Sequence, residues 1–562
     1  MAALIECVPN FSEGRDPEVI RRITDRIQSV EGATLLHVDR GVATNRTVVT
    51  FAGAPEPVLE AAFRAIQAAA ELIDMRTHHG EHPRMGATDV CPLVPLSGVS
   101  LEEAAALARR LAERVGREVG IPVFLYEAAQ PDPARRNLSV IRAGEYEGLP
   151  EKLRRPEWRP DFGPAEFVAR SGATVIGARD FLIAYNVNLN TTSTRRANAI
   201  AYDVREIGRP KREGNPVTGK VVTDAGGQPV MLPGSLKAVK AIGWYIEEYG
   251  IAQVSMNLTD ISVTPLHMAF DEVCRRAEAR GVRVTGSELV GLVPRSALLE
   301  AGRYFLRKQH RSTGVAEAEL IRIAVKSLGL DELAPFSPEE RIIEYRLRRA
   351  GDRRLALLTL ERFTDETASE SAAPGGGSVA AAVGSLGAAL GTMVANLSAH
   401  KPGWDDRWEE FSRWAERGQE LKEELLRLVD EDTRAFNLVI LALGLPKATP
   451  AEKAARKEAL DAANRGAIAV PFRVMQTAVR VFDLLEAMAR TGNPASVSDA
   501  GVGALCTRAA IRGAWLNVRI NLSGLSDPTS AVAMVTEGER LLKLSEERER
   551  AVLAAVEQKL QA

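Results

Sequence analysis

Short apolar runs alternate with longer amphipathic stretches over the first 180 residues, which predicts strands and helices in turn. The pair Asp16 and Pro17 predicts the beginning of one helix, and a capping box of Ser100 and Glu103 predicts another. The expected strands are 3–8, 34–38, 46–52, 90–96 and 122–126, and the longer helices are 56–73 and 100–119. Helices placed between paired strands indicate an α/β layer, with a sheet on one side and helices on the other.

The pattern restarts near Thr174 and predicts a second, smaller α/β unit. Its expected strands are 181–189, 241–246, 252–258 and 282–285, and its expected helices are 192–206 and 265–281. Within this unit, residues 209–235 are rich in Gly, Pro and Lys, and we interpret them as an inserted surface loop. Residues 230–232 are expected to pair with residues 221–223 as a hairpin in this loop.

The character of the chain changes around Pro335. Residues 335–355 contain two prolines, six arginines and four acidic residues, which is typical of a linker or a charged surface. Beyond this stretch no strand pattern follows, and the periodicity predicts helices over 404–443, 451–469 and 470–491. Breaks between helices are expected at Gly444-Leu445-Pro446 and at Gly492-Asn493-Pro494.

These patterns predict a multidomain chain. Two α/β subdomains of the ferredoxin-like, α+β sandwich kind are followed by an all-α helical-bundle domain. The expected divisions are 1–180 and 181–334 for the two subdomains, 335–355 for the linker and 356–562 for the helical domain. A length of 562 residues suits three or four folding units.

The charge balance narrows the classes of partner. Lys plus Arg number 72 and Asp plus Glu number 74, which argues against a general nucleic-acid binder. The four cysteines lie far apart and form no CxxC pair, so we expect reduced thiols and no zinc site. Residues 1–8 do not have the pattern of a signal peptide. A cytoplasmic location is therefore expected.

The stretch Ser378–Leu397 has no charged residue over twenty positions and could be mistaken for a membrane span. Its apolar content is mostly Ala and Gly, which are weakly hydrophobic and drive insertion poorly. Gly384, Gly387 and Gly391 instead indicate a helix packed closely against its neighbours. We therefore expect no membrane partner.

The densest polar cluster of the first half surrounds His78, His79 and His82. Gly80 and Pro83 make this stretch a loop or turn rather than a helix face. Imidazole titrates near neutral pH, so a loop histidine held by a rigid scaffold is a good proton-transfer group. Two alternatives remain open: surface or capping histidines, and a metal site with Asp89 as a further ligand.

Three other stretches of the first half are candidates for substrate contacts. Asp39 ends an expected strand, where a carboxylate commonly faces a cleft, although an ordinary turn aspartate is the simpler interpretation. Asn10 lies in a polar loop between strand and helix, where a substrate could be hydrogen-bonded. The stiff aromatic loop 158–164 could stack on a planar heterocycle or could form a domain interface.

In the second half, Gly375, Gly376 and Gly377 precede a helix, with Ser378 as its expected N-cap. Backbone N–H groups of such a loop make an anion site at a helix N-terminus. No lysine follows and no strand precedes the loop, so it is neither a Walker motif nor a dinucleotide fingerprint.

The acidic triplet of residues 430–432 lies late in a long amphipathic stretch. Three adjacent acids fan over most of a helix circumference, and Asp432 is four residues after Leu428, on the same face. A carboxyl group near an apolar face has a raised pKa and suits acid–base work. The alternative is a solvated acidic run.

Taken together, these stretches resemble the formimidoyltransferase-cyclodeaminase family. The resemblance is carried, in order along the chain, by residues 6–14, 80–86, 161–164, 290–294, 371–381 and 429–432. It implies that His82 is the transferase catalyst and that Asp432 is the deaminase catalyst. The candidate substrate contacts are Asn10, Asp39, Asp161, Phe162, Gly163, Pro164, Gly375, Gly376, Gly377 and Ser378.

The resemblance also implies the chemistry. Two α/β subdomains hold the folate in a cleft and pass a formimidoyl group between N-formimidoyl-L-glutamate and tetrahydrofolate. A helical cyclodeaminase then converts 5-formimidoyltetrahydrofolate to 5,10-methenyltetrahydrofolate and releases ammonia. Tetrahydrofolate, with or without a polyglutamate tail, is the carrier, no metal takes part, and dimers or rings of dimers are expected. The 209–235 stretch looks longer than its counterpart in animal enzymes, which puts subdomain contacts or assembly in doubt.

Two alternatives have the same motifs. One is a glutamate formyltransferase with a diverged helical domain, and the other is a non-catalytic folate-binding or scaffold protein.

Two further hypotheses concern the charged stretch and the helical part. The arginines of the charged stretch either hold the anionic glutamate tail or pair with Glu339, Glu340 and Glu344; they are Arg341, Arg346, Arg348 and Arg349. A fragment beginning near Leu355 is expected to fold and to work alone as a cyclodeaminase, provided that it can still self-associate.

Overall fold

The computed structural model describes residues 3–42, 45–80, 83–214, 219–347, 355–371, 373–522 and 528–561. The chain forms two compact units. The first consists of Met1–Ala301 and Ala324–Arg349, and the second of Gly302–Ile323 and Ala350–Ala562. Each unit combines two segments of the chain. The described residues of the second unit form helices and no strand.

The first unit contains a mixed seven-stranded sheet. Its strands are β1 (Leu4–Cys7), β2 (Asn10–Phe11), β3 (Ala33–Gly41), β4 (Arg46–Gly53), β5 (Thr88–Ser97), β6 (Val123–Glu127) and β7 (Thr174–Ala178). Strands β1 and β2 both lie between β4 and β5, and β3 pairs with the outer side of β4. Strands β5, β7 and β6 run parallel. The five predicted strands are confirmed, and two further strands that the sequence did not predict, β2 and β7, complete this sheet.

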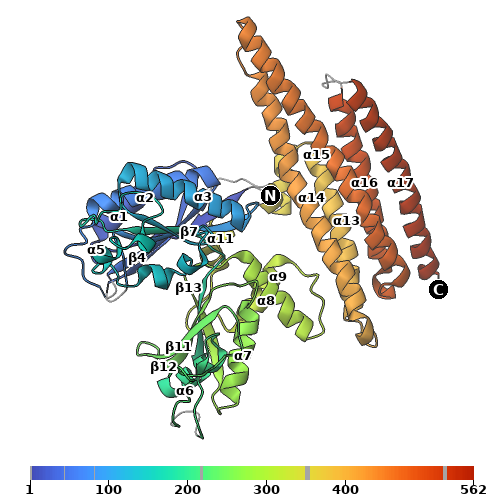
Figure 1. Ribbon diagram of the computed structural model, residues 1–562. Helices are drawn as coiled ribbons and strands as arrows, with labels where there is room; N and C mark the ends of the chain where they lie inside the picture. The colour runs from blue at the N-terminus through green and yellow to red at the C-terminus, as the bar shows by residue number, and fades with distance from the viewer. Residues whose placement is uncertain are drawn as a thin grey trace. The chain divides into compact units, whose positions relative to one another are not determined.

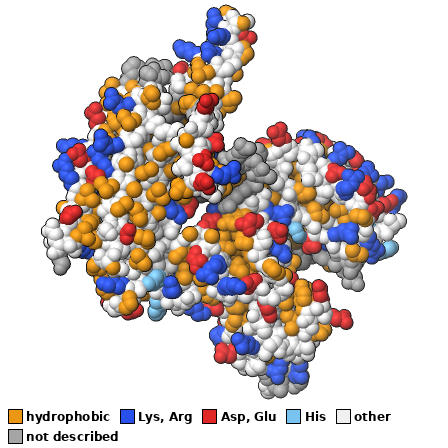
Figure 2. Space-filling model, turned by 180° about the vertical axis from the view of Figure 1, so that it is seen from behind, with side chains coloured by type: hydrophobic (Ala, Val, Ile, Leu, Met, Phe, Trp, Pro, Cys, Tyr) orange, Lys and Arg blue, Asp and Glu red, His pale blue; other side chains and the backbone are white. Residues whose placement is uncertain are grey.

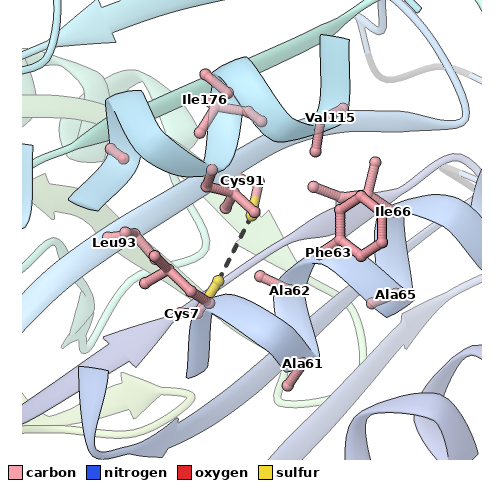
Figure 3. Packing of buried hydrophobic residues seen from close by; sticks show 14 of the residues in the cluster. Cys7, Ala61, Ala62, Phe63, Ala65, Ile66, Cys91, Leu93, Val115 and Ile176 are labelled. Carbon is pink, nitrogen blue, oxygen red and sulfur yellow. Dashed lines mark hydrogen bonds between the residues drawn. The ribbon is translucent and has the colours of Figure 1, made fainter. Parts of the chain in front are cut away.

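Helices α1 (Pro17–Gln28), α2 (Pro55–Leu72) and α3 (Leu101–Arg114) cover one face of this sheet (Figure 1). The predicted starts are confirmed, because Asp16 caps α1 and the Ser100–Glu103 capping box opens α3. Between helices and sheet lies the main apolar core, in which Cys7 and Cys91 approach within 3.5 Å beside Ala62 of α2 (Figure 3). Both are free thiols buried in this core.

The second subdomain of this unit has a four-stranded sheet in the order β11-β12-β8-β13. Its strands are β8 (Ile183–Leu189), β11 (Val239–Ile246), β12 (Ile251–Leu258) and β13 (Val284–Val290), with α6 (Thr194–Val204) and α7 (Leu266–Glu278) packed on it. Shorter helices of the first unit are α4 (Leu138–Arg142), α5 (Leu149–Lys152), α10 (Pro338–Arg341) and α11 (Ile343–Arg346). Helices α8 (Arg295–Lys308) and α9 (Glu317–Leu328) each extend from one unit into the other.

The hairpin expected inside residues 209–235 is found in part. Val230 N donates to Val222 O at 2.9 Å, as the expected pairing requires. The strand β10 (Met231–Leu232), however, pairs with β9 (Arg209–Pro210) rather than with residues 221–223. The insertion therefore folds back on its own beginning, so that Gly208 and Gly234 come close together.

The charged stretch that begins at Pro335 is not a linker over residues 338–346. Helices α10 and α11 occupy it, and Ile342 and Ile343 are 0% and 1% exposed. Ile343 packs with Leu36 and Ala52 of the large sheet. Composition suggested a solvated linker, but two adjacent isoleucines bury enough apolar surface to attach the stretch to the first unit.

The second unit is a bundle of long helices, and no strand occurs in its described part, as the sequence predicts. Its main helices are α12 (Leu360–Ala368), α13 (Gly376–Ala399), α14 (Trp408–Leu443), α15 (Pro450–Thr491), α16 (Val497–Asn521) and α17 (Pro528–Leu560). The breaks after Leu443 and Thr491 are confirmed. The expected division near residue 470 is wrong, because α15 runs through the buried Pro471.

Helix α13 is the one helix in the described part of the chain that is long and apolar enough to cross a membrane by length and composition. Of its most apolar window, 61% is buried among the other helices. A Cβ added to Gly387 would lie 2.5 Å from Thr507 Oγ1, and one added to Gly391 would lie 2.9 Å from Leu484 Cδ2. The predicted close packing through these glycines is therefore confirmed.

The segment Gly302–Ile323 is built into the helical bundle. Gly314 lies so close to α14 that an added Cβ would be 2.3 Å from Ala415 Cβ. The carbonyl oxygen of Gly314 accepts hydrogen bonds from Asn396 Nδ2 at 2.9 Å and from Gln419 Nε2 at 3.1 Å. The helical unit thus includes a short piece of chain that precedes residue 355.

This contact qualifies the expectation that the helical part folds alone. A fragment beginning at Leu355 lacks the segment, so Ala415 and two amide groups lose their cover. We expect a helical circular-dichroism spectrum but an unfolding midpoint about 5 °C or more below that of the intact unit. Adding a peptide of residues 302–323 should restore part of the loss. An insoluble or β-rich fragment would mean that the boundary lies elsewhere.

Candidate active sites

The large sheet has a second face that α1, α2 and α3 do not cover. Val49 and Phe51 of β4 point into the helix-covered core, so Val48 of the same strand points the other way. Directly opposed residues of antiparallel strands share a face. Asp39 of β3 and Asn10 of β2 are both paired with Val48.

Two residues predicted as substrate contacts are thereby brought into one row. Two strand spacings separate Asp39 from Asn10, about 9.6 Å at roughly 4.8 Å each. Asp39 is exposed and Asn10 is half-buried, with Arg46 Nε donating to Asn10 Oδ1 at 3.1 Å. The face opposite α1, α2 and α3 therefore carries both residues, although the sequence placed one at the end of a strand and the other in a loop. The Asn10 amide is held by the protein, because its Nδ2 donates to Val8 O at 2.9 Å.

The histidine loop borders this face, and His78 is the structural member of its cluster. Its Nε2 donates to Asn45 O at 3.0 Å, and its Nδ1 accepts from Arg84 Nε at 3.3 Å. Burial, the largest cause, and the nearby Arg84 charge lower the pKa of the His78 imidazole. His78 is therefore neutral with both ring nitrogens occupied, so it serves neither as a base nor as a metal ligand.

Asp89 is equally committed to the scaffold. Its side chain is fully buried, and Oδ2 pairs with Arg46 at 2.6 Å and Arg142 at 2.7 Å. Its Oδ1 accepts from Met85 N at 3.0 Å, which secures the end of the histidine loop. The metal alternative thus loses two of the four ligands proposed for it.

The central residue of this frame is Asn45, which the sequence did not single out. Asn45 Oδ1 accepts from Gly14 N at 2.9 Å, and Asn45 Nδ2 donates to His79 O at 3.0 Å. Its φ of 48° lies in the left-handed region, which asparagine tolerates better than most residues. The sequence could have marked Asn45 as a turn residue, because asparagine favours turns and this one lies in the connection between two paired strands.

His82 and Glu81 lie outside the described residues. The described chain resumes at Pro83, and Arg84 pairs with Glu147 at 2.6 Å and with Glu145 at 3.1 Å. A surface hollow is lined by His79, Gly80, Arg84, Gly144, Glu145 and Glu147. The loop that carries His82 is therefore anchored on both sides, by Asn45 before it and by Arg84 after it.

The stretch from Asp161 to Pro164 secures the end of β6. Asp161 Oδ2 accepts from Leu125 N at 2.8 Å and pairs with Arg135 at 2.9 Å. Gly163 has a φ of 80°, and an added Cβ would lie 2.2 Å from Ile121 O. Phe162 packs against the main core, and Pro164 is half-buried. These contacts serve the scaffold, and the substrate-contact assignment of the four residues stays a prediction.

The aromatic loop that precedes Asp161 also packs on its own subdomain. The Trp158 ring meets Phe124 edge-on with centroids 6.5 Å apart, and Lys152 Nζ lies 4.2 Å from the centre of the Trp158 ring. The contacts of Trp158 therefore support the packing interpretation of this loop.

In the helical unit, the glycine loop and Asp432 meet, as the resemblance requires. Ser378 Oγ donates to Asp432 Oδ2 at 2.9 Å. A Cβ added to Gly377 would lie 2.2 Å from Asp432 Oδ1, so only glycine permits this approach. Asp432 thus faces the first turn of α13, where unsatisfied N–H groups favour negative charge.

The environment of Asp432 shifts its titration. Burial, the largest cause, raises the pKa of the Asp432 carboxyl, and hydrogen bonds from the hydroxyl and N–H of Ser378 oppose the rise. The net direction is upward. A carboxyl group with a raised pKa is closer to the working pH and is better suited to exchange a proton with a substrate.

The three adjacent acids of α14 contact three different sets of residues, because they point in different directions around the helix. Asp430 Oδ1 accepts from Leu355 N at 2.7 Å. Glu431 forms ion pairs with Arg427 and Arg473. Only Asp432 turns to the glycine loop, so the interpretation as a solvated acidic run is wrong for this residue.

Ser378 is not the N-cap. Helix α13 begins at Gly376 with Gly375 as its N-cap, which places Ser378 in the first turn and directs its hydroxyl to α14. Thr433 lies 3.1 Å from the Ser378 hydroxyl. Asn517 of α16 is close as well, because a Cβ on Gly376 would lie 3.0 Å from its Nδ2. No local pattern marks Asn517, which only the helix packing brings to this site.

The chain thus combines an α/β unit that carries the histidine loop with a helical bundle in which the glycine loop meets a buried carboxylate. Three family models match the chain. They describe the formiminotransferase domain, N-terminal subdomain (residues 4–179), the formiminotransferase domain (residues 184–348) and formiminotransferase-cyclodeaminase (residues 359–540). The chain belongs to the formimidoyltransferase-cyclodeaminase family.

Individual relatives match the whole chain or one half of it. The formimidoyltransferase-cyclodeaminase of Gallus gallus is 46% identical over 564 residues, covering 100% of both chains. The glutamate formimidoyltransferase of Streptococcus pyogenes serotype M1 is 40% identical over 307 residues, which are 55% of this chain and 94% of that protein. The methenyltetrahydrofolate cyclohydrolase of Methylorubrum extorquens is 37% identical over 184 residues, 33% of this chain and 88% of that protein.

Proposed function

We propose that this chain passes a formimidoyl group between N-formimidoyl-L-glutamate and tetrahydrofolate, and then cyclises 5-formimidoyltetrahydrofolate to 5,10-methenyltetrahydrofolate with release of ammonia. The observation that carries the proposal is the 46% identity to a formimidoyltransferase-cyclodeaminase over the full length of both chains. The chain is an enzyme with both activities, and tetrahydrofolate is its substrate and one-carbon carrier.

The transfer step needs one proton shuttle. A nitrogen of tetrahydrofolate attacks the formimidoyl carbon and loses a proton, and the glutamate nitrogen gains one as it leaves. A single imidazole that titrates near neutral pH performs both transfers in turn. His82 has this role in the proposal, and the anchored loop around it supports the assignment, because a base must be held in reacting geometry. Asn10 and Asp39, on the face of the sheet opposite α1, α2 and α3, have the role of substrate contacts in the proposal.

The cyclisation step needs a second shuttle. The other reactive folate nitrogen attacks the formimidoyl carbon, its proton passes to Asp432, and Asp432 returns a proton to the nitrogen that leaves as ammonia. Ser378 holds the carboxylate at 2.9 Å in one orientation. Gly376 and Gly377 allow Asn517 and Asp432 to approach the first turn of α13, and the space beside Gly375 is open.

The proposal extends to organisation and location. The two α/β subdomains are of the ferredoxin-like kind, the transferase occupies residues 1–334 and the cyclodeaminase residues 356–562. The protein works in the cytoplasm as a homo-oligomer, either a dimer or a ring of dimers, without a metal. Hydrophobic side chains gather on the surface of the helical unit (Figure 2). The exposed apolar residues of α13 and α16 support self-association, and they are Leu386, Met393, Leu397, Val502 and Leu505.

An assay of both half-reactions on the purified chain tests this function. Formation of 5-formimidoyltetrahydrofolate from formimidoylglutamate, followed by ammonia release, is the expected result. Turnover of formylglutamate without ammonia release would identify a glutamate formyltransferase with a diverged helical domain. Folate binding without any turnover would identify a non-catalytic folate-binding protein.

We further propose that the arginines of the charged stretch bind the anionic polyglutamate tail of the folate. In the described part of the chain, Arg341 and Arg346 donate only to the carbonyl oxygens of Gly291 and Glu340, both at 3.4 Å, and form no ion pair. Glu344, one of the acids expected to neutralise them, instead accepts from Arg295 N at 2.8 Å. Arg348 and Arg349 lie outside the described residues.

Replacing these four arginines by glutamine should therefore remove the advantage of polyglutamylated over monoglutamylated substrate. Their positive charges attract an acidic chain over a Debye length of about 8 Å at physiological salt. We expect the KM for the polyglutamate to rise by about 10-fold, with turnover of the monoglutamate unchanged. Steady-state kinetics with both substrates measures the two KM values. Equal effects on both substrates would show that the arginines do not bind the polyglutamate tail.

A further inference from the structure

Asn517 of α16 lies beside the same turn of α13 as Asp432, and the proposed function gives it no chemical role. A Cβ on Gly376 would lie 3.0 Å from Asn517 Nδ2 and 3.4 Å from Asn517 Oδ1, and a Cβ on Gly377 would lie 2.2 Å from Asp432 Oδ1. The two glycines are neighbours in the chain, with Cα atoms about 3.8 Å apart. The amide of Asn517 and the carboxylate of Asp432 therefore flank adjacent positions of the glycine loop.

The Asn517 amide is oriented by one hydrogen bond. Its Nδ2 donates to Gly513 O, one turn earlier in α16, at 2.9 Å. A carbonyl oxygen can only accept, so the amide nitrogen must face Gly513 and the amide oxygen must face another direction. Among the described residues no N–H or O–H group donates to Asn517 Oδ1, and this oxygen is not sealed off from solvent. The amide thus presents one acceptor that the protein does not use.

The surroundings of this oxygen are open to a ligand. Gly375 and Gly376 are exposed, and Asn517 and Asp432 are half-buried rather than enclosed. A Cβ added to Gly375 would meet no atom within 4 Å. A substrate beside the first turn of α13 therefore has access to both the amide and the carboxylate.

The chemistry of the proposed cyclisation defines the partner of this acceptor. The formimidoyl carbon of 5-formimidoyltetrahydrofolate carries a nitrogen that bears N–H and leaves as ammonia once Asp432 has given it a proton. An amide oxygen that accepts this N–H holds the leaving nitrogen beside the acid. The 5-formyl analogue has an oxygen at the same position, and two acceptor oxygens that face each other repel. An acceptor at Asn517 therefore selects nitrogen over oxygen.

We propose that Asn517 is a specificity-determining residue of the cyclodeaminase, and that its amide oxygen accepts an N–H from the formimidoyl nitrogen and discriminates against a formyl group. This inference rests on the proposed function, because it assigns the contact to the nitrogen that leaves as ammonia. It goes beyond that function by naming the side chain that distinguishes two folates differing only in N–H against oxygen.

The Asn517→Ala variant of the full chain tests the contact. Ammonia release from 5-formimidoyltetrahydrofolate is measured without glutamate, so that the transferase does not consume the substrate, and 5-formyltetrahydrofolate serves as the competitive inhibitor. We expect the KM of the substrate to rise by about 10-fold, because one hydrogen bond is lost. The inhibition constant of the formyl analogue should stay the same or fall. Parallel increases in both constants, or no change in either, would overturn the proposal.

Two further variants separate this contact from a structural role of α16. Asn517→Asp keeps an acceptor oxygen but loses the bond to Gly513 O, so it should retain the preference for the formimidoyl group. Asn521→Ala removes an amide one turn further along α16 that donates to Ala467 O at 3.2 Å, and its preference should equal that of wild type. Loss of the preference in either variant would show that helix packing sets it, and would overturn the proposal.

Failure of this proposal and failure of the proposed function give different results. If the role of Asn517 is wrong, Asn517→Ala still releases ammonia and keeps the wild-type ratio of the two constants. If the proposed function is wrong, the wild-type chain itself releases no ammonia from 5-formimidoyltetrahydrofolate. Formimidoyl transfer by Asn517→Ala, measured on the same preparation, should equal that of wild type and shows that the rest of the chain is intact.

Discussion

Replacing Asp432 by asparagine is expected to lower the rate of ammonia release from 5-formimidoyltetrahydrofolate by about 100-fold or more, since a positioned acid–base group contributes roughly that factor. The asparagine keeps an oxygen that can accept from Ser378, so the geometry beside α13 is retained. Only the capacity to exchange a proton is lost. Formimidoyl transfer, measured on the same preparation, should be unchanged.

The raised pKa of Asp432 distinguishes an effect of Asp432→Asn on folding stability from an effect on proton transfer. Burial raises this pKa in the folded state, so the charged form is disfavoured by folding at any pH above the folded-state value. A neutral asparagine removes that cost, and the unfolding midpoint of Asp432→Asn at neutral pH should therefore not fall. As the pH falls toward the raised pKa, wild-type turnover should decline because the carboxylate becomes protonated, whereas the residual rate of the variant should not follow this decline.

Glu431→Gln is the matched control for Asp432→Asn. It removes one negative charge from the adjacent position of the same helix, but its partners are Arg427 and Arg473 rather than the glycine loop. We expect cyclodeaminase activity within about twofold of wild type, because exposed ion pairs contribute little to function or stability. Comparable losses in the two variants would show that helix charge, and not proton transfer by Asp432, supports the reaction.

Replacing His82 by alanine should abolish formimidoyl transfer and spare ammonia release from supplied 5-formimidoyltetrahydrofolate. The loss is expected to be about 100-fold or more, since one imidazole serves as base for the attacking amine and as acid for the leaving amine. Transfer that persists within about tenfold of wild type would remove His82 from the mechanism.

His79→Ala is the natural control, because His79 is exposed and contributes its backbone carbonyl rather than its ring to the Asn45 hydrogen bond. Its transfer rate should stay close to that of wild type. Elemental analysis of the purified protein completes the test, because a stoichiometric metal that is lost in His82→Ala would favour the ligand interpretation over the base.

Local patterns in the sequence determined much of the fold. The cap at Asp16, the capping box at Ser100 and the break after Thr491 depend on residues within one turn of each other, so they can be recognised without knowing the tertiary structure. The same is true of the glycine loop and the acidic triplet as separate motifs. Their assignment to a site came from the resemblance, because neither motif is specific by itself.

Tertiary structure alone decided which residues meet. Ser378 and Asp432 are 54 positions apart, and the distance between them depends on how α13 packs on α14. Strand pairing likewise decides which face of the large sheet each residue occupies, since a shift of one residue in register would turn Glu6 into the core. The burial of Ile342 and Ile343 and the passage of α15 through Pro471 have the same origin. In each case contacts between distant segments outweigh the local preference of the chain, and no window of sequence contains both partners.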